Sequence, residues 1–522
     1  MEDLTAFFTL SVSVIITVLV VTLTKWNRSP AITPPSPPKL PILGHLHLLT
    51  DMPHHSFSQL AQKLGPIIYL QLGRIPSLVI SSARLAREVL KTHDHAFASR
   101  PQIIAAQYLS FGCSDVTFSA YGPYWRQARK ICVTELLSSK RVSSFQRIRD
   151  EEVNLLLASL SALSGKETDM SHRFFSLANN VLCRVAFGSR YVDDESRVEG
   201  AGGSKSRLPE ILTEAQALFA GFSIGDFYPA LEWVNWLTGL KRRLERNLGD
   251  LRTVCDEIIK EHLEKRKTSS GSAATTDDAS DREDFVDVLL RVQKGGDLEV
   301  PITDDNLKAL VLDMFVAGTD TTSATLEWAM TELARHPDVM KKAQTEVRSV
   351  FGSKGRVEEG DLQQLVYMKA VIKETLRLHP PAPLLVPRES IEKCVLDGYE
   401  IPAKTRVFIN TYAIGRDPLS WEHPLEYNPE RFIGTNIDVK GQDFELLPFG
   451  GGRRGCPGYS FGLATIEIAL ARFLYHFDWA LPNGVTADDV DLTEIFGLAT
   501  RKKVALLLVP TTIKDYEFKR TG

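Results

Sequence analysis

Residues 449–458 read Phe-Gly-Gly-Gly-Arg-Arg-Gly-Cys-Pro-Gly, and this stretch is the most informative part of the sequence for the fold. Glycines and a proline bend the backbone around one thiol, that of Cys456, and a helical pattern from Tyr459 to Tyr475 follows. The neighbouring arginines and a helix N-terminus both favour a thiolate, so we expect a lowered pKa for Cys456. The chain has six cysteines, scattered without paired spacing, so neither a zinc cluster nor a disulfide framework is indicated. A lone thiolate instead suggests an axial ligand to haem iron.

Two other interpretations of the cysteine loop carry less weight. A glycine-rich loop that opens a helix can bind phosphate, but the Lys-Ser/Thr ending of a P-loop is absent. A buried structural cysteine is the usual role of a single thiol, yet that role does not require the regular spacing seen here. The pattern Phe449-x-x-Gly-x-Arg-x-Cys456-x-Gly resembles the haem-binding signature of the cytochrome P-450 monooxygenases.

Composition is that of an ordinary globular protein. Hydrophobic residues make up 43% and charged residues 24% of the 522-residue chain. The formal net charge of −4 argues against a nucleic-acid partner. Length alone favours about three domains, but no clean break between folding units follows the N-terminal segment, so we expect one domain over residues 45–522.

The N-terminal segment is typical of a membrane anchor. Leu4 to Leu23 is apolar or small and carries no charge, and about twenty such residues suffice to span a bilayer as a helix. Lys25 and Arg28 follow the run, with Trp26 at the expected interface, which predicts that the body lies on the cytosolic side. A cleaved signal peptide is the alternative, disfavoured because the positive charge follows the apolar run. We therefore expect residues 1–28 to form a single-pass anchor.

Proline-rich residues 29–44 predict a stiff, extended hinge between the anchor and the body. Short alternating patterns at residues 67–71 and 78–80, around Gly73, predict a β-hairpin. Helical patterns dominate the remainder of the chain. The resemblance implies the cytochrome P-450 fold, a mainly α triangular helical prism around haem with a small β-rich region, preceded here by a transmembrane helix.

The longest predicted helix runs from about Asp304 to Arg335, with Thr303 or Asp304 as its cap and His336-Pro337 at its end. Its apolar stripe is interrupted by Ala-Gly-Thr-Asp-Thr-Thr at residues 317–322. A tolerated polar patch on a surface helix is one interpretation. The other is the family's oxygen-activation groove, where the resemblance implies that Asp320 and Thr321 deliver protons to dioxygen and that Gly318 lets ligand approach the backbone.

A second pair of short motifs gains meaning only through the resemblance. Glu374 and Arg377 are three residues apart and share a helix face, which by itself indicates a solvated ion pair. In the family the equivalent glutamate and arginine join the arginine of a Pro-Glu-Arg-Phe motif in a buried network, which implies that Arg431 is their partner here. We expect this clamp to serve folding rather than catalysis.

Haem carries two propionates, which require cations. By resemblance, Phe449 and a set of cationic or N–H donors bind the cofactor. A surface charge is the alternative for each arginine taken separately. The expected cofactor-binding residues are Arg100, Trp125, Arg129, Arg388, Phe449, Arg454 and Cys456, with Cys456 as the metal ligand.

The resemblance implies a haem-thiolate monooxygenase that inserts one atom of O2 into a lipophilic small molecule of terpenoid, flavonoid or alkaloid type, as in plant specialised metabolism. Its cofactor is haem b, with NADPH and flavin acting indirectly through NADPH–cytochrome reductase, at the endoplasmic reticulum membrane.

A basic patch near the cysteine loop would steer that reductase, although a solvated charged face is an equally good interpretation of these residues. The patch comprises Arg126, Lys130, Lys140, Arg141 and Arg453.

Substrate-facing positions have no signature, so they rest on resemblance alone, and ordinary core packing is the alternative for each. The expected pocket residues are Phe219, Phe222, Phe315, Ala317, Leu385 and Phe496. Two other functions remain open, namely a haem-thiolate isomerase or dehydratase that acts without O2, and a non-catalytic haem-binding protein. The intact Asp320-Thr321 pair argues against both.

Overall fold

The computed structural model describes residues 33–190, 207–220, 223–269, 283–295, 298–352, 354–497 and 499–513. The predicted anchor, residues 1–28, lies outside the described residues. No helix in the described part of the chain is both long and apolar enough to cross a membrane.

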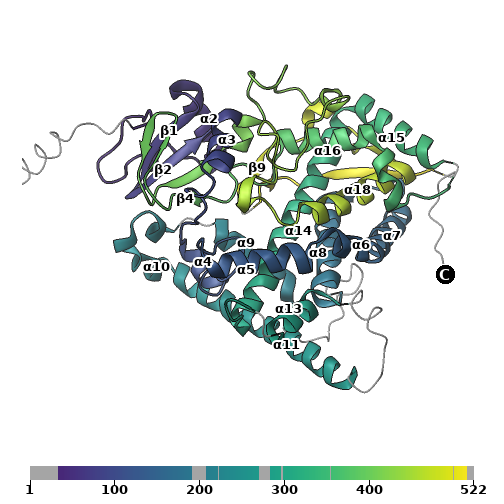
Figure 1. Ribbon diagram of the computed structural model, residues 1–522. Helices are drawn as coiled ribbons and strands as arrows, with labels where there is room; N and C mark the ends of the chain where they lie inside the picture. The colour runs from purple at the N-terminus through teal and green to yellow at the C-terminus, as the bar shows by residue number, and fades with distance from the viewer. Residues whose placement is uncertain are drawn as a thin grey trace, which may run out of the picture.

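Helices make up most of the molecule, whose outline in Figure 1 is roughly triangular. A mainly α protein with a small β-rich region was the prediction, and it is confirmed. The α-helices are α2 (Pro53–Leu64), α3 (Ala83–Arg87), α4 (Ile104–Leu109), α5 (Pro123–Ile131), α6 (Ser139–Ser144), α7 (Gln146–Ala162), α8 (Met170–Phe187), α9 (Leu208–Ala220), α10 (Val234–Leu237), α11 (Leu240–Ser269), α13 (Phe285–Lys294), α14 (Asp304–Arg335), α15 (Pro337–Phe351), α16 (Val366–Leu378), α17 (Thr411–Ile414) and α18 (Tyr459–His476).

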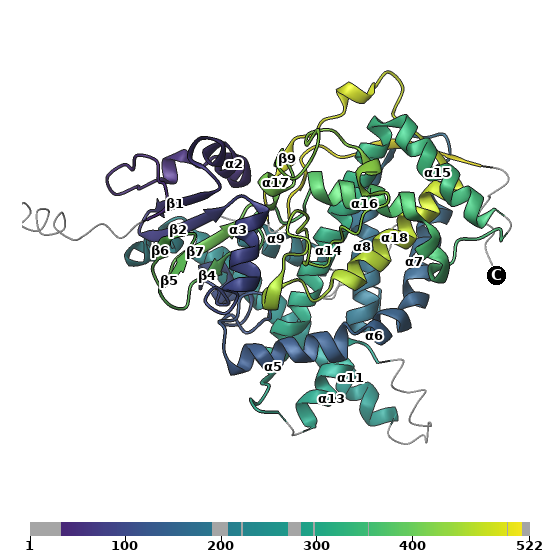
Figure 2. The same ribbon diagram turned by 45° about the horizontal axis from the view of Figure 1, so that its top comes forward.

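The largest sheet lies at one side of the molecule with α2 and α3, apart from the main helical body (Figures 1 and 2). Its strand order is β1-β2-β7-β4, with β1 (Ile67–Leu72), β2 (Ile75–Ile80), β7 (Arg406–Ile409) and β4 (Arg388–Glu389). The predicted hairpin is confirmed, since β1 and β2 are antiparallel neighbours. The smaller sheets are β3-β11-β8 (Thr168–Asp169, Leu507–Thr512, Phe477–Ala480), β5-β6 (Cys394–Leu396, Tyr399–Ile401) and β10-β9 (Arg501–Lys502, Glu494–Ile495).

The hinge predicted at residues 29–44 is described from residue 33 onward and lies along β1. The Tyr69 N–H donates to the Pro35 carbonyl at 2.9 Å, and the His45 N–H donates to the Gln71 carbonyl at 2.7 Å. These bonds occupy backbone groups of the edge strand that would otherwise lack partners.

Helix α14 crosses the helical body, as the views in Figures 1 and 2 show. Its predicted limits are confirmed: Thr303 caps the first turn by accepting from the Asn306 N–H at 3.1 Å, and Asn306 bonds back to the Thr303 N–H at 2.9 Å. With 32 residues, it is roughly 48 Å long. Most of its side chains are buried, because α8, α16 and α18 all pack against it.

Glu374, Arg377 and Arg431 meet in the interior. The Arg377 guanidinium donates to both oxygens of Glu374, at 2.6 and 2.8 Å, and Arg431 Nε donates to Glu374 Oε1 at 3.0 Å. Arg377 also donates to the Gly415, Pro424 and Glu426 carbonyls. The network therefore ties α16 to the chain between residues 415 and 431, which passes into the segment that carries the cysteine loop.

Removing the central carboxylate should destabilise the protein strongly. Glu374→Ala leaves the buried Arg377 guanidinium without its counter-ion, and losing one partner of a buried pair costs about 3–5 kcal/mol. Lys393→Ala removes half of the exposed Lys393–Glu400 pair and should cost under about 1 kcal/mol. Urea unfolding followed by circular dichroism measures both free energies of unfolding. Equal losses in the two variants would contradict the assigned role of the clamp.

Candidate active site

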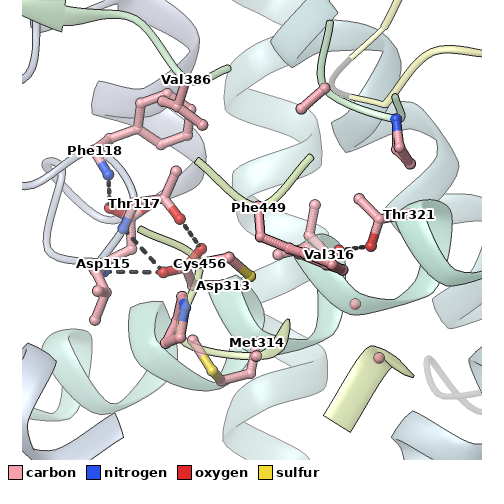
Figure 3. Close-up of a pocket in the computed structure, with 18 of the residues that line it drawn as sticks. Asp115, Thr117, Phe118, Asp313, Met314, Val316, Thr321, Val386, Phe449 and Cys456 are labelled. Carbon is pink, nitrogen blue, oxygen red and sulfur yellow. Dashed lines mark hydrogen bonds between the residues drawn. The ribbon is translucent and has the colours of Figure 1, made fainter. Parts of the chain in front are cut away.

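One interior cavity of about 250 Å³ brings the sequence motifs together. It is lined by the cysteine loop, by one face of α14, by α9 and by the loop of residues 115–118 (Figure 3). Most of this lining is apolar, and Cys456 and Thr321 both face the space. Catalysis on a small molecule requires a concave, mainly apolar site with a few polar groups, and this cavity has that character.

The cysteine loop is shaped by glycine where no other residue fits. Gly452 has a φ of 65°, and a Cβ at this position would lie 2.1 Å from the Leu90 carbonyl oxygen. The Cys456 N–H donates to the Phe449 carbonyl at 2.8 Å and closes the loop. The Cys456 side chain is exposed only because it faces the cavity, whose walls surround it.

The expected lowering of the Cys456 pKa is wrong for the protein by itself. Burial raises this pKa, and it outweighs the Gly458 and Tyr459 N–H groups and the Arg129 charge, which lower it. Neighbouring charges and the helix N-terminus favour the thiolate, but the cost of burying a thiolate is larger. A bound cation would have to displace the thiol proton, as is general for thiolate ligands.

Four arginines line the cavity and are held mainly by neutral carbonyl groups. Arg129 donates to Gly455 at 2.5 Å, and Arg454 donates to Ala98 at 2.8 Å, Val116 at 3.1 Å and Ser119 at 2.7 Å. Arg100 and Arg388 complete the set. Arg100 donates to the Thr117, Val386 and Pro387 carbonyls, and Arg388 donates to Gly451 and to the Asp94 carboxylate.

The four guanidinium groups repel one another, because the cavity wall is poorly solvated. Burial lowers the pKa of Arg454 to about 9, and the charges of Arg388 and Arg129 contribute. The pKa of Arg100 is lowered by burial and by Arg454 and Arg388. The described lining has four guanidinium groups and two carboxyl groups, and it includes no histidine. An excess of positive charge around one thiol fits a haem, whose two propionates would neutralise the arginines while Cys456 ligates iron.

Trp125 differs from its expected role as a direct cofactor contact. It does not belong to the described cavity lining, and its indole N–H is donated to the Val116 carbonyl at 3.0 Å. The Arg454 guanidinium lies over its ring, 4.0 Å from the ring centroid. In this structure Trp125 positions Arg454.

Thr321 and Asp320 lie on different faces of α14. Thr321 lines the cavity, and its Oγ1 donates to the Ala317 carbonyl at 2.8 Å (Figure 3). Asp320 is absent from the described lining; it is buried near Gln216 of α9, and its Oδ1 has no partner within the described ranges. Burial raises the pKa of Asp320, so its carboxyl can hold a proton nearer neutral pH than an exposed aspartate can.

Gly318 serves helix packing as well as access to the cavity. It lines the cavity, and a Cβ added to it would lie 2.8 Å from Cδ1 of Leu182. The missing side chain therefore lets α8 approach α14 closely beside the groove.

The expected pocket residues divide into three groups. Phe219, Ala317 and Leu385 line the cavity, and Phe222 lies outside the described residues. Phe315 and Phe496 do not belong to the described lining.

Geometry explains why these two rings lie outside the described lining. Phe315 is 1% exposed and its ring stacks on Phe187, with centroids 5.6 Å apart, because it falls two residues before Ala317 and so points to the other side of α14. Phe496 packs against the apolar cluster that α2 forms on β1 and β2, where a large ring is better removed from water.

The lining also includes residues outside the expected set, among them Phe118, Asp115, Thr117 and Asp313. Phe118 stacks on Phe219 with ring centroids 5.3 Å apart and planes 5° apart, and forms an aromatic wall of the cavity. Next to it, Thr117 Oγ1 donates to Asp313 at 2.6 Å, and Asp115 accepts from the Phe118 N–H at 2.6 Å (Figure 3). The available signal was Asp313, an aspartate in the apolar stripe of a buried helix, four residues before Ala317.

Comparison with known proteins agrees with this geometry. A family model described as Cytochrome P450 matches residues 34–509. Tryptamine 5-hydroxylase of Oryza sativa subsp. japonica is 57% identical over 501 residues, which cover 94% of this chain and 93% of that protein. Cytochrome P450 71AP13 of Prunus mume is 53% identical over 476 residues, covering 91% and 89% respectively.

A solved zebra fish cytochrome P450, determined with progesterone, superposes with a TM-score of 0.72 at 26% identity, and covers 88% of this chain and 99% of that chain. Similarity thus extends along nearly the whole body, in sequence and in fold. Together with a lone thiol facing a cation-rich cavity under a long helix, it shows that the chain belongs to the cytochrome P450 family.

Proposed function

We propose that this protein hydroxylates an aromatic amine of the tryptamine type, as a membrane-bound enzyme of specialised metabolism. The observation that carries the proposal is one cavity that unites the Cys456 thiol, the Thr321 hydroxyl and the stacked pair Phe118 and Phe219. A flat aromatic substrate gains most from such a wall. The 57% identical rice relative, named for tryptamine hydroxylation, supports the same substrate class.

The broader class does not depend on that substrate. The protein is a monooxygenase of lipophilic small molecules, because its family and its named hydroxylase relative share this chemistry. One atom of O2 enters the substrate and the other leaves as water, so each turnover requires two electrons and two protons. An isomerase or a non-catalytic haem protein would need neither these electrons nor these protons.

Arg100, Arg129, Arg388 and Arg454 would hold the haem propionates, and Cys456 would hold the iron. When bound, the haem supplies the activation of dioxygen, which no side chain can perform. The chain itself would contribute position and proton delivery: Thr321 presents Oγ1 to the cavity, and Asp320, whose pKa burial raises, is the adjacent carboxyl that could supply protons toward that hydroxyl. Val116, Phe118 and Leu385 exclude water from the same space.

We infer that the electrons come from NADPH through a flavoprotein reductase. Arg126 and Lys130 are exposed on α5, the helix whose Arg129 bonds the cysteine loop, so an acidic partner there would lie close to Cys456. Arg453 and Arg141 of the expected basic patch pair with Asp94 and Glu283. The patch is therefore more weakly charged than its sequence suggests.

We also propose that the protein is held at the endoplasmic reticulum membrane, with its body in the cytosol. The predicted anchor at residues 1–28 is one support. The other is an exposed apolar group, in which Trp233, Trp236 and Leu237 are 62%, 73% and 62% exposed. Tyr228 donates to the Ile42 carbonyl and so brings this group beside the hinge, where Ile42 is 84% exposed. Exposed tryptophans beside an anchor suit the interface of a bilayer.

Replacing the thiol tests the iron ligand. In Cys456→Ser the sulfur is lost while the size and the loop are kept, so the reduced protein with carbon monoxide should lose its thiolate-type absorption spectrum. Cys113→Ser, which alters a buried cysteine outside the described cavity lining, should retain that spectrum. An unchanged spectrum in Cys456→Ser would contradict the assignment.

Tryptamine itself tests the substrate. Added to the purified protein, it should shift the haem absorption spectrum, and turnover with reductase and NADPH should give a product one oxygen atom heavier by mass spectrometry. Phe219→Ala should raise the Kd for tryptamine about three- to tenfold, because one aromatic contact contributes about 0.5–1.5 kcal/mol.

Phe496→Ala is the matched control for tryptamine binding, since that ring lies outside the cavity lining. The Kd of the Phe496→Ala variant for tryptamine should equal that of the unaltered protein. Absence of both the spectral shift and the product would reject the amine and leave the monooxygenase class in place.

Truncation and two matched leucines test the membrane proposal. Deletion of residues 1–28 should release most protein from microsomes, and the truncated form should still bind phosphatidylcholine vesicles weakly. Leu237→Ser should reduce that residual binding about tenfold, since burying a leucine contributes about 1.5–3 kcal/mol. Leu419→Ser, at a leucine that is 94% exposed outside this group, should have no effect. Equal vesicle binding by Leu237→Ser and Leu419→Ser would refute the proposal that the exposed apolar group contacts the membrane.

A further inference from the structure

Asp313 connects helix α14 to the loop of residues 114–119 through three hydrogen bonds. Its Oδ2 accepts from the Val116 and Thr117 N–H groups at 3.0 and 3.1 Å, and its Oδ1 accepts from Thr117 Oγ1 at 2.6 Å (Figure 3). Bonds to a charged acceptor contribute more than neutral ones, about 1.5–3 kcal/mol each. The carboxylate is therefore the main attachment of this loop to the helix.

The same loop holds two of the cofactor-facing cations by its carbonyl groups. The Thr117 carbonyl accepts from Arg100 Nε at 2.9 Å, and the Val116 and Ser119 carbonyls accept from Arg454 at 3.1 and 2.7 Å. The N–H groups of residues 116 and 117 thus point to Asp313 while their carbonyls point to the arginines. A shift of the loop would move both guanidinium groups.

The side chains of the loop form part of the substrate wall. Val116 and Phe118 line the cavity, and Phe118 stacks on Phe219 of α9. Within the loop, Asp115 accepts from the Phe118 N–H at 2.6 Å, which fixes the turn on which the ring is carried. Cofactor cations and substrate wall therefore depend on one short segment.

We propose that Asp313 is a positioning residue that fastens loop 114–119 to α14 by hydrogen bonding, and thereby sets Arg100 and Arg454 for the haem and Phe118 for the substrate. The proposal rests on the proposed function in taking this cavity as the haem and substrate site. It adds a residue of the cavity lining that acts on both groups through the loop, and it links the helix of the oxygen groove to the opposite wall.

Two substitutions at one position separate hydrogen bonding from charge. Asp313→Ala removes all three bonds. Asp313→Asn keeps an oxygen that can accept from both N–H groups, and its amide can donate to Thr117 Oγ1, so the attachment survives without the charge. Glu327→Gln is the control, because Glu327 is a buried carboxyl on the same helix that bonds Ser171, away from this loop.

The readouts are the rate of haem loss from the purified holoprotein to excess apomyoglobin and the hydrogen exchange of the peptide that contains residues 114–119. Asp313→Ala should lose haem at least tenfold faster and expose the loop amides, which corresponds to losing one charged hydrogen bond. Asp313→Asn should remain within about threefold of the unaltered protein, and Glu327→Gln should match it in both measurements. If Asp313→Ala does not yield folded protein, Thr117→Val removes one bond and should still accelerate haem loss about threefold or more.

Unchanged haem loss and loop exchange in Asp313→Ala, or in Thr117→Val where only that variant folds, would overturn the proposal. So would an Asn variant as impaired as the Ala variant, because charge would then be the cause. Neither measurement uses tryptamine or turnover. A protein that loses haem as expected but ignores tryptamine would therefore reject the proposed substrate while supporting the role of Asp313.

Discussion

Compensation of buried charge is the constraint on which this structure depends. A guanidinium or carboxylate taken out of water must find opposite charge or hydrogen-bond partners, or it destabilises the fold by several kcal/mol. The Glu374 network meets this requirement within the protein, since Arg377 and Arg431 share one carboxylate. The arginines around the cavity meet it only in part, through neutral carbonyls. The first set stabilises the chain, and the second leaves a positive excess that suits an anionic cofactor.

That contrast explains which features the sequence could predict. The limits of α14 and the hairpin follow from capping, periodicity and turn residues, which act locally, whereas the general fold was expected through the resemblance. The contact between Glu374, Arg377 and Arg431 was expected only through the resemblance. Nothing in a Glu-x-x-Arg pair distinguishes a buried ion-pair network from a solvated ion pair. The low pKa expected for Cys456 failed for the same kind of reason. Neighbouring charges can be read from a sequence, whereas burial cannot.

Substrate-facing residues were the least predictable part of the site. Phe315 and Phe496 are aromatic and were expected at the pocket by resemblance, but Phe315 is buried in the core and Phe496 is a partly buried ring packed against the cluster of α2, β1 and β2. Phe118 was absent from the expected set although it forms the aromatic wall with Phe219. Which ring enters a cavity depends on the rotation of a helix or the path of a loop, and both are decided by contacts far away in the chain. Asp313, by contrast, was visible as a charge in an apolar stripe.

The spacing along α14 has a consequence for the length of the chain. Asp313, Ala317 and Thr321 recur every fourth residue, so they share one face of the helix and present the loop attachment, the cavity wall and the hydroxyl in a fixed register. One residue inserted between Asp313 and Thr321 would rotate one of them by about 100° relative to the other. Point substitutions in this interval alter one property at a time, whereas a single insertion or deletion would separate the cofactor wall from the oxygen groove. The register of this stretch is therefore compatible with changes of residue type at constant length and not with a change of length.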